Sequence, residues 1–292
     1  MDFATFLIQC LNALQYGLLL FLVASGLTLI FGIMGVINLA HGSFYMIGAY
    51  MAYALAPMVA SSFGGAFFST MVVGLVLSVI LGYVLEWAFF SYLYEREHLQ
   101  QVLMTYGLIL VFEELRSMLV GDDVHGVAVP PLLDGTFPLN DVMTYPVYRL
   151  FISGVCLLLA IGMWFVFTRT RLGMMIRAGT ANREMVQSLG IDITLLYRIV
   201  FAMGVALAVF AGMIAAPISS VYPGMGNMVL IICFVVVVIG GIGSVKGALV
   251  AALLIGLVDT FGKVLLPQAA GVLVYVLMAL ILLWRPHGLF KD

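Results

Sequence analysis

The stretch Gly26-Leu-Thr-Leu-Ile-Phe-Gly-Ile-Met-Gly-Val-Ile-Asn-Leu-Ala-His-Gly-Ser-Phe-Tyr-Met-Ile-Gly-Ala-Tyr50 is the most informative part of this chain. It begins as an apolar helix, breaks, and resumes as an apolar helix. The break is rich in glycine and polar residues: Gly32, Gly35, Asn38, His41 and Gly42. An unpaired backbone amide in hydrocarbon costs roughly several kcal/mol, so protein or water must cover such a break. Discontinuous membrane helices are where many transporters place their substrate path.

The composition of the whole chain is that of a membrane protein. Of 292 residues, 64% are hydrophobic and 9% are charged, far from the balance of soluble domains. Apolar runs near the length of about 20 residues needed for a span recur throughout. The net charge of −2 excludes a strongly basic, nucleic-acid-binding surface.

The apolar runs predict an all-α polytopic protein of about eight to nine transmembrane helices in a single domain, 1–292. The first run, 6–31, is too long for a signal peptide and is interpreted as a retained span. The count is eight if the seventh and eighth runs form one re-entrant unit. The predicted spans are 6–31, 43–60, 66–92, 102–120, 147–168, 197–217, 228–243, 247–262 and 271–284.

Basic residues set the predicted orientation. The connection 169–198 carries five arginines, whereas the loop 121–146 carries four aspartates and no Lys or Arg. The positive-inside rule therefore places the first segment in the cytoplasm and the second outside. Counting spans from there leaves the N-terminus outside and the C-terminus cytoplasmic.

A second glycine-rich break joins two apolar runs near the C-terminus. It reads Gly240-Gly-Ile-Gly-Ser244 and is followed by Lys246. It lacks the Lys-Ser/Thr pair of a P-loop, and no such motif occurs in the chain, so a P-loop site for ATP is excluded. The three cysteines are isolated in apolar runs, without the spacing of metal ligands, and are interpreted as packing residues.

Both breaks resemble the signatures of LivH-type permeases, the membrane subunits of branched-chain amino-acid ABC importers. The matching runs are Gly-Ile-Met-Gly-Val-Ile-Asn-Leu-Ala-His-Gly at 32–42 and Gly-Gly-Ile-Gly-Ser at 240–244. Relatives often have an acidic residue where this chain has Ser43, so no acidic role is expected there. The predicted substrate-path residues are Gly32, Gly35, Asn38, His41, Gly42, Gly240, Gly241, Gly243 and Ser244. The alternative is that Asn38 and His41 merely pair with neighbouring backbone.

A third match lies in the basic connection. Its pattern of Arg177, Ala178, Asn182 and Arg183, then Leu189 and Gly190, resembles the coupling helix that ABC permeases dock into their ATPases. Thr180 is predicted to cap a short helix that has Met185, Val186 and Leu189 on one side and ends at Gly190. The alternative is an ordinary basic cytoplasmic loop without a docking role.

The resemblance implies a multi-pass bacterial inner-membrane protein that translocates branched-chain or other neutral amino acids by alternating access. It implies a second, LivM-like permease subunit, two cytoplasmic ATPase subunits that bind ATP and Mg, and a periplasmic substrate-binding protein. The chain itself would need no cofactor or metal and would have no catalytic residue. Related permeases handle urea, short amides and aromatic acids, and the sequence does not separate these substrates.

Two other classes are weighed against this interpretation. An ion-coupled secondary carrier would need carboxylates within spans. Only Glu86 and Asp259 qualify, and each is expected to stand alone. An intramembrane enzyme would need a nucleophile with its base, but His41 and Ser43 are only two residues apart and have no third partner.

Gln9, Asn12 and Gln15 share one face of the first span and are interpreted as interhelical hydrogen-bonding groups. Small residues every four positions from Gly204 to Ala216 and from Ala248 to Gly256 predict close helix packing.

Overall fold

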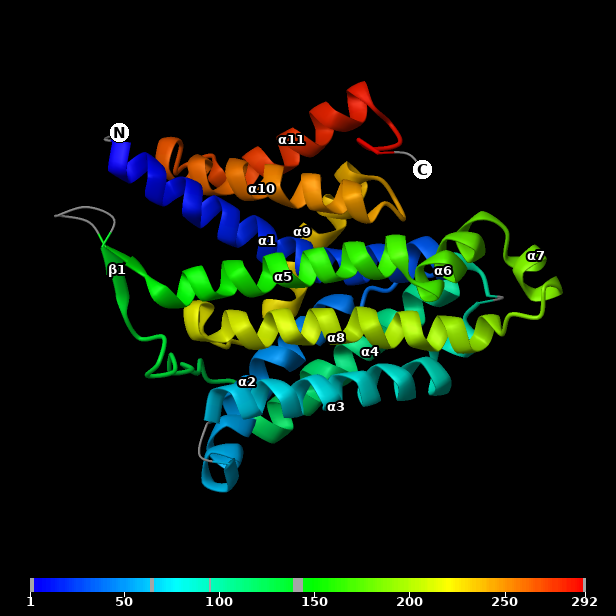
Figure 1. The fold of residues 1–292 in the computed structure, drawn as a ribbon, viewed down its shortest axis with the longest axis horizontal. Helices are drawn as coiled ribbons and strands as arrows, with labels where there is room; N and C mark the ends of the chain where they lie inside the picture. Colours follow the sequence, from blue (N-terminus) through cyan, green and yellow to red (C-terminus); the bar gives the residue numbers. More distant parts are fainter. Residues whose placement is uncertain (1–2, 64–65, 95, 139–143, 291–292) are drawn as a thin grey trace.

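The computed structural model describes residues 3–63, 66–94, 96–138 and 144–290, with the side chains of 58–63, 66, 181 and 183 outside this description. Long helices account for most of this part of the chain (Figure 1). They are α1 (Phe3–Met34), α2 (His41–Phe63), α3 (Ala66–Ala88), α4 (His98–Val120), α5 (Val147–Arg169), α8 (Ile193–Ser219), α9 (Met225–Gly240), α10 (Val245–Leu265) and α11 (Ala270–Trp284). Shorter elements connect them: η1 (Phe90–Tyr92), the β1 (Thr136–Pro138) and β2 (Thr144–Pro146) hairpin, α6 (Arg171–Ala181) and α7 (Arg183–Ser188).

Each predicted span overlaps one of these long helices, which confirms an all-α polytopic membrane protein. Within the described residues, five helices are both long and apolar enough to cross a bilayer. The apolar helices α9 and α11 are shorter, with 16 and 15 residues. The choice between eight and nine crossings stays a prediction.

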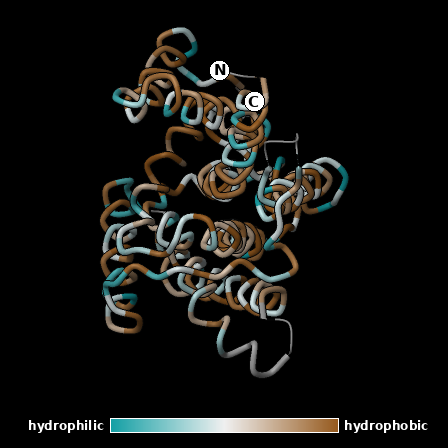
Figure 2. The backbone as a smooth tube through the Cα atoms, turned by 90° about the vertical axis from the view of Figure 1, so that its left-hand side faces the viewer, coloured by the Kyte–Doolittle hydropathy of each residue, from teal (hydrophilic) through white to brown (hydrophobic). Residues whose placement is uncertain are grey.

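The core of the bundle is built around α1 and α8. In its most apolar window α1 is 89% buried and α8 is 78% buried, whereas α5 is only 22% buried. Hydrophobic residues nevertheless extend over the outer helices as well as the central ones (Figure 2). This distribution is typical of a membrane protein, whose outer helices face lipid rather than water.

The small-residue pattern produces the close packing that it predicts. A Cβ added at Gly212 would lie 2.0 Å from the carbonyl oxygen of Tyr45 in α2. A Cβ at Gly256 would lie 2.5 Å from the carbonyl oxygen of Ala13 in α1. These glycines therefore let α8 and α10 touch their neighbours backbone to backbone.

The two ends of the bundle differ in character. The hairpin β1–β2 and the acidic loop before it lie at the end where the chain begins, and α6 and α7 lie at the opposite end (Figure 1). The described tail, residues 285–290, lies on the side of α6 and α7. The start of α1 and this tail thus lie at opposite ends of the bundle, as the predicted orientation requires, while the orientation itself stays a prediction.

Candidate functional site

The first break carries the chain back into the bundle after α1 ends. Gly35 follows Met34 with a φ of 65°, a left-handed conformation that glycine adopts without strain. The chain then returns so that His41 Nε2 lies 2.9 Å from the carbonyl oxygen of Val23. Val23 precedes the end of α1 by eleven residues, which is about 16 Å of helix. The segment 35–40 is therefore re-entrant, and α2 begins deep inside the protein.

Two buried side chains of α4 hold the backbone of this re-entrant segment. The N–H of Ile37 donates to Gln101 Oε1 at 3.4 Å, and the Thr105 hydroxyl reaches the Ile37 carbonyl at 3.5 Å. Gln101 also donates to the carbonyls of Leu93 and Arg96. Sequence reasoning missed both residues, although two polar side chains four positions apart on an apolar helix were a usable signal.

Asn38 and His41 have polar atoms that the protein does not satisfy. Both residues are fully buried, and neither Oδ1 nor Nδ2 of Asn38 has a hydrogen-bond partner in the described part of the chain. His41 Nδ1 is likewise unpaired. Leaving a buried polar group unpaired costs about 1–3 kcal/mol. The expectation of pairing with backbone thus holds only for Nε2 of His41, and the other atoms remain available to water or a polar ligand.

The second break is a tight hairpin between α9 and α10. Gly241 and Gly243 have φ values of 100° and 83°, and the Ser244 hydroxyl caps α10 by accepting the N–H of Gly247 at 3.2 Å. A Cβ at Gly247 would lie only 1.9 Å from the carbonyl oxygen of Gly240. Every glycine of this hairpin therefore occupies a position where a side chain would be strained or would collide.

The C-terminal tail packs against the hairpin between α9 and α10. The N–H groups of Leu289 and Phe290 donate to the carbonyls of Ile239 and Gly240 at 2.8 and 3.2 Å. These bonds satisfy carbonyls at the C-terminal end of α9 that no helical partner could reach. The second break differs in this way from the first, because its polar groups are paired within the protein.

The structure brings the two breaks into contact. A Cβ on Gly32, near the end of α1, would lie 2.6 Å from the Cα of Gly243. Gly42, by contrast, packs against Gly226 in α9. Gly32 thus joins the first break to the second, while Gly42 joins the start of α2 to α9.

The predicted coupling segment forms two short helices rather than one. Asn182, not Thr180, caps α7, since its Oδ1 accepts the N–H of Met185 at 2.9 Å. Thr180 lies inside α6 and donates its hydroxyl to the carbonyl of Arg177, so its predicted capping role is wrong. Gly190 follows α7 with a φ of 81°, which confirms the predicted end of this helix.

The apolar residues of α7 do not share one side as expected. Val186 is buried, whereas Met185 and Leu189 are 59% and 73% exposed. Residues four apart lie on the same helix face, so this exposed pair forms an apolar knob at the end of the bundle. Arg177 and Ala178 are also exposed, while the Arg183 side chain lies outside the described part of the structure.

Glu86 does not stand alone. Its carboxylate Oε2 lies 3.0 Å from Arg198 Nε, and the Tyr94 hydroxyl donates to its other oxygen. The Glu86 side chain is fully buried, and Arg198 belongs to the first turns of α8, directly after α7. This ion pair therefore ties the start of α8 to the end of α3. Asp259 is paired too, with Lys263 at 2.6 Å.

The fold and these sites define the class of the protein: a multi-pass helical membrane protein with a re-entrant segment and an exposed helical knob at one end. The sequence profile of the family described as "Branched-chain amino acid transport system / permease component" matches residues 9–283, and the chain belongs to that family.

Named branched-chain amino acid permeases align with this chain over almost their whole length. The chain is 30% identical to the high-affinity branched-chain amino acid transport system permease protein BraD of Pseudomonas aeruginosa, covering 97% of this chain and 95% of the relative. It is 27% identical to LivH of Escherichia coli, covering 99% and 96%. It is 28% identical to a probable LivH of Methanocaldococcus jannaschii, covering 95% and 90%.

Proposed function

We propose that this chain is the transmembrane subunit of an ATP-driven, binding-protein-dependent importer of branched-chain or other neutral amino acids in a bacterial inner membrane. The observation that carries the proposal is the exposed Met185–Leu189 knob in a chain of this permease family. A short helix with an apolar face suits docking in a groove of a partner protein. The proposed partners are two cytoplasmic ATPase subunits, a second permease and a periplasmic binding protein. ATP and Mg belong to the ATPases.

The proposed substrate path runs along the first break. Unpaired atoms of Asn38 and His41 there can bond a polar group, and Gly35 gives the backbone its left-handed turn. The second break serves as a fixed wall for the path, because it touches Gly32 through Gly243. A movement of α7 would reach the bundle through α8 and the Glu86–Arg198 pair.

An ion-coupled carrier finds less support. Glu86 and Asp259, the carboxylates that such a carrier would use, are each held by a basic side chain. Neither is therefore the unpaired carboxylate within a span that the ion-coupled alternative needs. The substrate is identified by assaying each candidate class in the same transport experiment: neutral amino acids, urea, short amides and aromatic acids.

Reconstitution tests the ATP-driven mechanism. The chain alone in liposomes should neither hydrolyse ATP nor accumulate leucine, and both activities should appear once the second permease, the ATPases and the binding protein are added. Concentrative uptake by the chain alone, driven by a proton or sodium gradient, would refute the proposal.

A charged substitution tests whether the Met185–Leu189 knob docks on an ATPase subunit. Leu189→Glu places a carboxylate on the proposed docking face, so we expect ATPase assembly or substrate-stimulated hydrolysis to fall at least about tenfold, as for loss of a buried apolar anchor. Gln187→Glu, on the same exposed helix, is the matched control and should change little. A cysteine at Glu184 should cross-link to an ATPase subunit. Normal coupling by Leu189→Glu together with no cross-link would rule out α7 as the coupling helix.

A further inference from the structure

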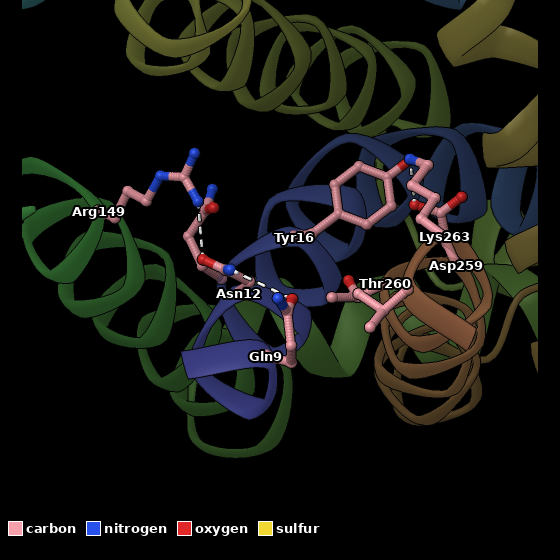
Figure 3. Close-up of a pocket in the computed structure, with 9 residues that line it drawn as sticks. Gln9, Asn12, Tyr16, Arg149, Asp259, Thr260 and Lys263 are labelled. Atoms are coloured by element: carbon pink, nitrogen blue, oxygen red, sulfur yellow. Dashed lines mark hydrogen bonds and ion pairs between the residues drawn. The ribbon is translucent and has the colours of Figure 1, made fainter. Parts of the chain in front are cut away.

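A polar pocket opens between α1, α5 and α10 at the end of the bundle where the chain begins (Figure 3). Its volume of about 350 Å³ falls at the lower end of the range for small-molecule sites. Three helices supply its polar lining: Gln9, Asn12, Gln15, Arg149, Asp259 and Lys263. Polar and ionisable side chains in membrane helices are costly, and they mark substrate or ion pathways more often than lipid-facing surfaces.

One wall of the pocket presents a guanidinium that a neutral group holds in place. Arg149 Nη1 donates to Asn12 Oδ1 at 2.7 Å, and the Tyr145 hydroxyl donates to the same oxygen at 3.1 Å. Asn12 is itself fixed by donating to Gln9 Oε1 at 3.4 Å. None of the ion pairs within the described residues involves Arg149, so its positive charge is not neutralised there. A guanidinium has five N–H donors in a planar fork, so Arg149 retains donors for a carboxylate.

The opposite wall carries a carboxylate of its own. Asp259 pairs with Lys263 at 2.6 Å, and Lys263 Nζ lies 5.6 Å from the centre of the Tyr16 ring. Figure 3 shows Arg149 on one side of Tyr16 and the Asp259–Lys263 pair on the other. The pocket therefore has one cation without an ion pair among the described residues, Arg149, facing an Asp259–Lys263 pair whose charges neutralise each other.

Among the described residues, two cations and one carboxylate line the pocket, so its net charge favours a ligand with an anionic group. The transported amino acid offers such a group in its main-chain carboxylate, which can accept parallel N–H donors of Arg149. A lipid phosphate is the competing anion, and uptake in vesicles without anionic phospholipid separates the two. We infer that the pocket is an outer subsite in which Arg149 binds the main-chain carboxylate of the transported amino acid on its way to the first break. This inference rests on the proposed function and adds Arg149 to the residues that bind substrate.

The test uses the complete importer in proteoliposomes and the purified permease pair without its binding protein. Three variants are compared with the wild type: Arg149→Gln, Arg149→Lys, and Arg116→Gln as the control. Arg116 also lies near the acidic loop, but Glu113 and Asp122 already neutralise it. Uptake of leucine is measured per assembled complex, in vesicles with and without anionic phospholipid. Equilibrium binding to the permease pair is measured with leucine and with leucinamide, which lacks the carboxylate.

Arg149→Gln should lower leucine uptake at least about tenfold, the effect expected for loss of a hydrogen bond between charged groups. Arg149→Lys should recover part of the uptake, and Arg116→Gln should stay within about twofold. The permease pair should bind leucine more tightly than leucinamide, and Arg149→Gln should abolish that difference.

Equal uptake by Arg149→Gln and the wild type would overturn the subsite while leaving the proposed function intact. So would an effect of Arg149→Gln confined to vesicles with anionic phospholipid, which would assign the pocket to lipid. A wild-type complex that takes up no neutral amino acid would instead overturn the proposed function and the subsite with it.

Discussion

The two glycine-rich breaks look alike in sequence but differ in how their polar groups are satisfied. In the second break the Ser244 hydroxyl caps α10 and the C-terminal tail bonds to Ile239 and Gly240. In the first break Asn38 is fully buried, and neither polar atom of its side chain has a partner among the described residues. The polar groups of the second break are bonded within the protein, whereas those of Asn38 in the first break are available to a polar ligand.

The comparison shows that glycine content alone does not identify a transport path. Glycines in the hairpin of the second break are required by close backbone contacts or by a positive φ. A Cβ at Gly35, in contrast, would meet no described atom within 4 Å beyond its chain neighbours. Buried polar groups without partners are rare in native proteins and each needs an explanation. The unpaired atoms, not the glycines, therefore distinguish the break that we assign to substrate from the break that we assign to structure.

The largest effect is expected from Gly241→Val in the structural break. The backbone there has a φ of 100°, and a Cβ would lie 2.2 Å from the carbonyl oxygen of Phe290. Strain of about 1–3 kcal/mol for the left-handed backbone adds to this collision, so the tail should lose its docking site. We expect the amount of assembled complex to fall at least about tenfold, as measured by co-purification with the partner subunits.

The matching change in the first break is Gly35→Ala, which meets open space and costs only about 1–2 kcal/mol for its left-handed backbone. Its assembly should be close to normal and its uptake reduced.

The sequence suggests Gly17 in the regular part of α1 as a neutral control, but a Cβ there would lie 3.0 Å from the Ala252 carbonyl oxygen. Gly107→Ala, in open space on α4, is the better control. Equal assembly by all these variants would remove the distinction between the breaks.

An intermediate effect is expected from Asn38→Leu. The substitution replaces unpaired polar atoms by an apolar side chain of similar size, so the folded protein should be about as stable or more stable. Uptake per assembled complex should nevertheless fall about tenfold or more, because a polar ligand loses its donor and acceptor. Thermal unfolding and uptake on the same preparation measure both quantities. A less stable protein with normal uptake would show that Asn38 is a structural residue.

The smallest effect is expected from Gln101→Leu, which removes the support that α4 gives to the first break. The lost bonds to Ile37, Leu93 and Arg96 should loosen the re-entrant segment and reduce uptake a few-fold, since each neutral hydrogen bond contributes about 1 kcal/mol. Gln100→Leu, at the neighbouring exposed position, is the matched control. If the two variants behave alike, the support from α4 is not needed for transport.

Much of the fold follows from local sequence, because apolar runs and glycine breaks determine helices and their ends. The small residues at Gly212 and Gly256 likewise predict the close contacts that are observed. The contacts of Glu86 with Arg198 and of Ile37 with Gln101 join residues 112 and 64 positions apart, and no local pattern encodes them. Thr180 was misassigned as a cap because Asn182, two residues later, offers an equally good capping oxygen.

Accessibility to water during turnover distinguishes a break that lines the substrate path from a break that the protein closes. Single cysteines at Asn38 and Ser244 are introduced after replacement of the native Cys10, Cys156 and Cys233, and each is treated with a membrane-impermeant thiol reagent. We predict that the cysteine at Asn38 reacts during ATP-driven transport and is protected by substrate, while the cysteine at Ser244 stays unreactive throughout. A reactive, substrate-protected cysteine at Ser244 together with an inert one at Asn38 would contradict the account.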